Sequence, residues 1–150
     1  MKNNYLEKLR FTLILENVND KKINPEISVG INGERNHFFK IDSGINTFKF
    51  DEVIYKTGEN CLTLCVDSNN NNIDSFHSFI IKDLKIHGIS VTEGLYRCEY
   101  FPLYTKEHLL ENPDAVKTIK SGLYVGNAGK WNWYFDSPIK ENVEFKFGLW

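Results

Sequence analysis

The 150-residue sequence has few of the residues that build helices. It contains no Gln and only two Ala, whereas 17 residues are Asn, 14 are Ile and 14% are aromatic. Ala, Leu, Glu and Gln favour helices, while β-branched and aromatic residues favour strands and Asn favours turns. The composition therefore argues against a helical bundle and predicts a β-rich protein.

An excess of one charge and a long apolar run are also missing. The sequence has 18 Lys and Arg residues and 20 Asp and Glu residues, so its net charge is −2. This charge does not indicate a nucleic-acid partner. No stretch approaches the roughly 18 to 20 apolar residues of a membrane span. The start, Met1–Tyr5, has no apolar run after its charge, so we expect no signal peptide and synthesis in a cytoplasm. The length predicts one domain over residues 1–150.

Cysteines and catalytic motifs are scarce as well. Cys61 and Cys65 lie four residues apart in a predicted strand, about 13 Å, which is too far for a disulfide. A zinc site from these two with His77 and His87 has an unusual histidine spacing, so buried free thiols are favoured. No phosphate loop, His-Glu-x-x-His or Gly-x-Ser-x-Gly motif occurs. We expect a non-catalytic protein with no obligatory cofactor, although two carboxylates that meet in space for sugar hydrolysis stay an alternative.

Alternating apolar and polar residues indicate about ten short strands, separated by Gly, Asn and Asp turns. Asn32-Gly33 predicts a hairpin turn, and the alternation slips at Lys82-Asp83 as in a bulge. A second hairpin is predicted between residues 123–125 and 130–135. We therefore expect an all-β, jelly-roll-like antiparallel β-sandwich with one irregular or short helical excursion around residues 102–121.

Five short motifs follow one another between Pro25 and Val91. They are an alternating strand that ends at Gly, a Phe-rich strand, Gly-x-Asn, an Asn/Asp loop and an apolar strand that ends at Gly. In this sequence they correspond to Ile27–Gly33, Phe48–Phe50, Gly58–Asn60, Asp67–Asp74 and Leu84–Gly88. This order resembles the calcium-dependent carbohydrate-binding modules of the xylan-binding type.

The resemblance implies that the Asn/Asp loop donates oxygen ligands to calcium, which helps to hold sugar hydroxyls. The matching positions are Asp67 and Asp74, with Asn69 and Asn72 as further oxygen donors. Calcium is thus a possible cofactor, and a solvated turn is the alternative for the same loop.

The second half of the chain carries another set of motifs. They are Gly88–Val91, Tyr100–Tyr104, Leu123–Trp131 and Phe135–Ile139, the third of which contains Tyr-x-Gly-Asn-x-Gly-x-Trp. With the first half, they resemble small β-sandwich proteins of tailed bacteriophages. This resemblance implies a virion component of the tail or head. Its partners would be other virion proteins, further copies of itself in a symmetric assembly, or a host surface glycan.

Aromatic residues supply the remaining candidates. Trp131, Trp133 and Phe135 alternate along one strand and are expected to face the core, which leaves Tyr134 facing outward. Tyr104, Tyr134 and Trp150 are candidates for contact with a ligand or a protein partner. The leading hypothesis is a non-catalytic phage virion protein, and the alternative is a calcium-assisted carbohydrate-binding module.

Overall fold

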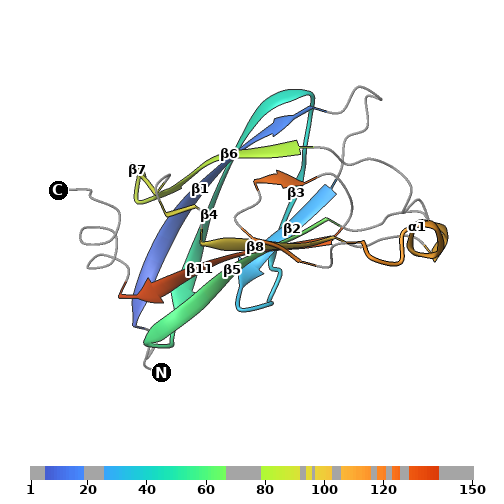
Figure 1. The fold of residues 1–150 in the computed structure, drawn as a ribbon. Helices are drawn as coiled ribbons and strands as arrows, with labels where there is room; N and C mark the ends of the chain where they lie inside the picture. Colours follow the sequence, from blue (N-terminus) through green and yellow to red (C-terminus); the bar gives the residue numbers. More distant parts are fainter. Residues whose placement is uncertain are drawn as a thin grey trace.

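The computed structural model describes residues 6–18, 26–66, 79–91, 94–95, 97–102, 106–115, 118–120, 123–125 and 129–138. These residues form two antiparallel β-sheets packed against each other (Figure 1). Sheet A contains, in spatial order, β10 (Tyr124–Val125), β6 (Phe79–Ile86), β1 (Glu7–Asn17) and β4 (Gly44–Ile54), and β7 (Ile89–Ser90) pairs with β6. Sheet B contains β3 (His37–Lys40), β2 (Glu26–Ile31), β5 (Gly58–Val66), β11 (Gly129–Ser137), β8 (Cys98–Pro102) and β9 (Ile119–Lys120). The predicted all-β sandwich is confirmed.

The core lies between the two sheets and is rich in aromatic rings. Phe11 of β1 stacks on Phe50 of β4 with ring centroids 5.3 Å apart, and it meets Phe135 of β11 edge-on at 6.2 Å. Trp131, Trp133 and Phe135 are each 0% exposed, which confirms that this face of β11 points inward. Aromatic pairs of this kind add about 0.5–1.5 kcal/mol beyond the area that they bury.

One open edge of the sandwich is closed by side chains from β3 and β4. A hydrogen bond of 3.0 Å joins Nε2 of His37 and Oε1 of Glu52. Phe39 stacks on Phe48 beside this pair, with centroids 4.5 Å apart. Since β3 belongs to sheet B and β4 to sheet A, these contacts tie the two layers together.

Two tight turns have the left-handed backbone that short hairpins require. Asn32 and Gly33 have φ values of 53° and 88°, and β2 pairs with β3 beyond them, so the first predicted hairpin is confirmed. His87 and Gly88 have φ values of 53° and 80° between β6 and β7. Both pairs place Gly at the second central position, where a side chain would be strained.

The predicted bulge is confirmed, whereas the second predicted hairpin is wrong. The pairing of β1 with β6 shifts between Ile14, opposite Asp83, and Leu15, opposite Ile81, which leaves Lys82 as the extra residue. β10 pairs with β6 in sheet A, but β11 pairs with β5 and β8 in sheet B. The chain between β10 and β11 therefore passes from one sheet to the other instead of joining two paired strands.

The predicted excursion contains a short helix, α1 (Lys106–Glu111), and β9, which pairs with β8. In the described part of the chain, no helix is long and apolar enough to cross a membrane. The three cysteines are free thiols, but only Cys98 is buried as predicted. The prediction of burial is wrong for Cys61 and Cys65, which are half-buried and point outward from β5, since their neighbours Leu62 and Leu64 face the core.

Candidate functional site

The predicted calcium loop connects the two sheets at one end of the sandwich. β5 ends at Val66, which pairs with Gly129 in sheet B, and β6 begins at Phe79, which pairs with Val125 in sheet A. Both strand ends lie on the right of Figure 1, the side on which α1 also lies. We call this the loop end of the sandwich. Asp67, Asn69, Asn72 and Asp74 belong to the connecting segment, residues 67–78, which lies outside the described residues.

The segment that carries Tyr104 leaves from the same end. β8 ends at Pro102, which pairs with Gly129 of β11, and Gly129 pairs with Val66 of β5. Since neighbouring strands lie about 4.8 Å apart, Pro102 and Val66 are about 10 Å from each other. Tyr104 itself lies outside the described residues, as does Trp150. The structure thus brings together the strand ends from which two of the predicted segments begin.

Tyr134 lies away from the loop end. It is half-buried on the outer face of β11, opposite Cys61, and its hydroxyl accepts a long hydrogen bond of 3.5 Å from Nδ2 of Asn132. Five residues separate it from Gly129, which is about 17 Å along a strand. Burial raises the pKa of Tyr134 above its ordinary value, so the phenol stays protonated at neutral pH. A ligand contact at Tyr134 would therefore belong to a different surface from the predicted loop.

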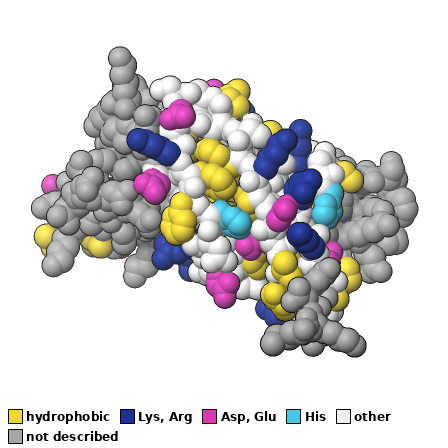
Figure 2. Space-filling model, turned by 180° about the vertical axis from the view of Figure 1, so that it is seen from behind, with side chains coloured by type: hydrophobic (Ala, Val, Ile, Leu, Met, Phe, Trp, Pro, Cys, Tyr) yellow, Lys and Arg dark blue, Asp and Glu magenta, His cyan; other side chains and the backbone are white. Residues whose placement is uncertain are grey.

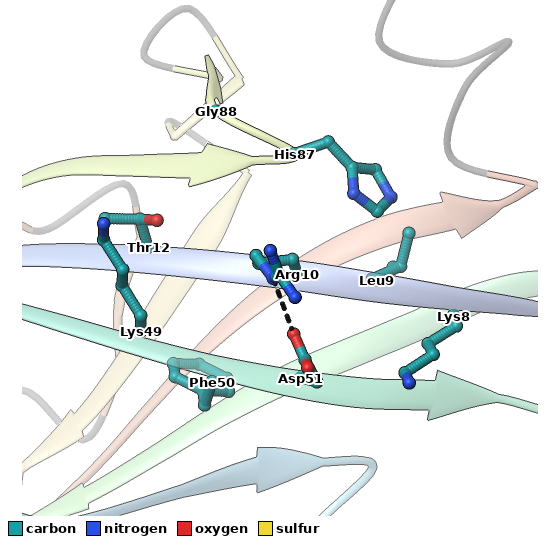
Figure 3. A pocket seen from close by; sticks show the side chains of 9 residues that line it. All are labelled: Lys8, Leu9, Arg10, Thr12, Lys49, Phe50, Asp51, His87 and Gly88. Atoms are coloured by element: carbon teal, nitrogen blue, oxygen red, sulfur yellow. Dashed lines mark hydrogen bonds and ion pairs between the residues drawn. The ribbon is translucent and has the colours of Figure 1, made fainter.

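A groove on the outer face of sheet A was not predicted from the sequence. It has a volume of about 770 Å³ and lies over β1, β4 and the turn after β6 (Figure 3). Its lining residues are Lys8, Leu9, Arg10, Thr12, Lys49, Phe50, Asp51, His87 and Gly88. We call it the sheet A groove. In Figure 2, Lys and Arg side chains gather beside His and acidic side chains on this side of the molecule.

The strand register determines how the charged groups of the sheet A groove meet. Arg10 faces Asp51 across β1 and β4, and its Nε donates a hydrogen bond of 3.1 Å to Oδ1 of Asp51. Two residues further along the same strands, Lys49 is paired with Thr12. Figure 3 shows the Lys49 side chain reaching toward β1. On the other side, the backbone N–H of His87 donates to the carbonyl of Arg10 at 2.8 Å, which holds the histidine beside β1.

No group of three or more His, Cys, Asp or Glu side chains is placed to hold a metal ion within the described ranges. His87 belongs to the sheet A groove, whereas Cys61 and Cys65 point outward from sheet B, so the fold does not bring them together. For the predicted loop, the donor chemistry can be tested against calcium. Two carboxylates bound through both oxygens and two amide oxygens supply about six oxygen ligands, the lower limit of the six to eight that calcium takes.

Comparison with known proteins identifies the fold. No family model and no curated protein matches the sequence. A solved structure described as vCBM60 in complex with galactobiose is similar with a TM-score of 0.53 and 6% identity, covering 83% of this chain and 96% of that one. A selenomethionine form of vCBM60 is similar with a TM-score of 0.53 and 9% identity, covering 83% and 89% of the two chains. It is described in connection with two families of calcium-dependent carbohydrate-binding modules linked by circular permutation.

Both neighbours are carbohydrate-binding modules, and the similarity shows that this chain shares their β-sandwich fold.

Proposed function

We propose that this protein is a non-catalytic glycan-binding module that takes up its ligand at the loop end with the help of calcium. The observation that carries the proposal is the fold similarity to vCBM60, whose solved structure holds galactobiose. The order of motifs from Pro25 to Val91 supports the same class independently, because it depends on the sequence pattern and not on the backbone.

In this proposal, Asp67 and Asp74 hold the ion, and Asn69 and Asn72 complete its oxygen shell. Calcium, when bound, supplies a cation that can coordinate sugar hydroxyls directly. The protein contributes the fixed strand ends of β5 and β6 on either side of the segment, and the segment with Tyr104 begins about 10 Å away. An aromatic ring there would offer its flat face to the apolar side of a sugar.

Calorimetric titration with calcium and with neutral oligosaccharides, galactobiose among them, tests the proposal. We expect sugar binding in millimolar calcium, its loss in EDTA, and its loss in the double variant Asp67→Ala with Asp74→Ala. The matched control is Glu34→Ala with Glu59→Ala, which removes two exposed carboxylates from the opposite end of the sandwich and should leave binding unchanged. Absence of calcium binding at millimolar concentration, or sugar binding that is equal in EDTA, would contradict the role of calcium.

The virion role remains a prediction from the sequence, since both structural neighbours are carbohydrate-binding modules. It is compatible with glycan binding, because a virion protein can recognise a host surface glycan. Mass spectrometry of assembled phage particles tests it, and a strictly monomeric protein absent from the particles would count against it.

A further inference from the structure

The sheet A groove is positively charged although the protein is not. Lys8, Arg10 and Lys49 line it together with one carboxylate, Asp51, so its charge is +2 with His87 neutral. The whole chain has a net charge of −2. The groove therefore has a local excess of positive charge on a protein whose net charge is negative, and such a local excess attracts anionic ligands.

The groove cations are left largely without acidic partners. Among the described residues, Lys8 and Lys49 form no ion pair. Arg10 contacts Asp51 through Nε, and its two terminal nitrogens make no hydrogen bond to another described residue. Asp51 thus fixes the guanidinium while leaving the Nη atoms accessible. Two parallel N–H groups of this kind match the two oxygens of a carboxylate.

The groove also contains a hydroxyl group, that of Thr12, among its cations. Thr12 is 9% exposed, and its hydroxyl forms no hydrogen bond to another described residue. It lies between Lys49 of β4 and Lys85 of β6, which are its partners in the strand register. Its hydroxyl can donate a hydrogen bond to a ligand carboxylate or accept one from a ligand hydroxyl.

From these observations, we propose that the sheet A groove binds an acidic oligosaccharide that carries carboxylate groups. This inference goes beyond the proposed function and does not rest on calcium. Successive cations on β1 are two residues apart, about 6.6 Å, so they suit a ligand with repeated charges better than a single small anion. The aliphatic stems of the lysines add apolar surface for sugar rings, and beside Gly88 there is open space.

A nucleic acid is the competing occupant, since it also carries repeated negative charges. Its charges are about 1.7 Å apart along a duplex, and affinity for it depends on many phosphate contacts. Three cations on a protein with a net charge of −2 supply few such contacts. The groove therefore favours an oligosaccharide whose charges are widely spaced and which also offers hydroxyl groups.

Calorimetry with a short oligogalacturonate, in EDTA, tests the inference. We expect binding that weakens as the ionic strength rises from about 0.01 M to 0.15 M, over which the Debye length falls from about 30 Å to 8 Å. The variant Lys8→Ala with Lys49→Ala should weaken it about tenfold, since two charge-assisted contacts are lost. Both side chains are exposed, so the fold should be retained.

The matched control is Lys40→Ala with Lys120→Ala, which removes two exposed cations from sheet B and should leave the affinity unchanged. The same oligosaccharide with its carboxyl groups reduced to alcohols should not bind in EDTA. Three results would overturn the inference: equal loss in the control, equal binding of the reduced sugar, or tighter binding of an oligonucleotide of similar charge.

The two proposals fail separately. Loss of neutral-sugar binding in Asp67→Ala with Asp74→Ala concerns the loop end, and acidic-sugar binding should persist in that variant. Acidic-sugar binding that disappears there would assign it to the loop end and would contradict the groove.

Discussion

At the scale of single residues, two glycines at the β2–β3 hairpin have different roles. Gly33 lies in the hairpin turn and has a positive φ of 88°, whereas Gly30 lies in β2, before the turn. At Gly30, an added Cβ would lie 1.7 Å from the backbone oxygen of Glu34. Gly30 is therefore required because the chain after the turn folds back across the outer face of sheet B.

Gly30→Ala should accordingly lower the free energy of unfolding by about 3 kcal/mol, because a backbone segment has to move. Gly33→Ala is the control from the adjacent turn: nothing lies within 4 Å of its added Cβ, and only the left-handed backbone is strained. That strain costs about 1 kcal/mol. Urea denaturation measures both, and an equal or smaller loss for Gly30→Ala would show that the close approach to Glu34 does not exist.

At the scale of strands, the sequence predicts where elements lie better than which elements pair. Leu9, Phe11, Leu13 and Leu15 mark β1 because side chains alternate between the faces of a strand. The same alternation marks β11, but it carries no information about its partners. The Gly-rich sequence before β11 is as compatible with a passage between sheets as with a hairpin, so the predicted pairing with residues 123–125 was wrong.

The observed pairing predicts specific contacts in nuclear magnetic resonance spectra. Val125 faces Phe79 in β6, and the amide of Ile81 donates to the carbonyl of Leu123 at 2.8 Å. We expect cross-strand nuclear Overhauser effects between Val125 and Phe79, and slow exchange of the Ile81 amide because it is hydrogen-bonded. Cross-strand effects between Val125 and Lys130 would instead support the hairpin and refute the assignment of β10 to sheet A.

Because local sequence predicts strands but not their pairing, it reveals some candidate sites and not others. The segment Asp67–Asp74 can be proposed from the sequence because its candidate ligands are close together there. Tyr134 is correctly predicted to face outward because its neighbours face the core. The sheet A groove joins Lys8 and Arg10 to Lys49, about forty residues away. Alternation shows that each points outward, but their proximity depends on the register in which Thr12 faces Lys49. Register between distant strands is set by the packed core, and local sequence does not report it.

At the scale of the whole molecule, the two sheets share one core, so we expect them to unfold together. Phe11 of sheet A contacts Phe135 of sheet B, and small single domains usually unfold in one cooperative transition. In a Trp150→Phe background, fluorescence reports sheet B alone, because the remaining tryptophans, Trp131 and Trp133, lie on β11. Circular dichroism in the far ultraviolet reports both sheets.

Phe11→Leu in sheet A should therefore shift the urea midpoints of both signals equally. It removes ring contacts with Phe50 and Phe135, and we expect a loss of about 1–2 kcal/mol. Phe38→Leu is the control, because Phe38 is 64% exposed on sheet B and its substitution should change stability by about 0.5 kcal/mol or less. A shift of the circular dichroism midpoint without a matching shift in tryptophan fluorescence would mean that the sheets unfold separately. In that case, a ligand bound to sheet A would stabilise sheet A without stabilising sheet B. If the sandwich unfolds cooperatively, a ligand at either proposed site stabilises the whole protein against unfolding.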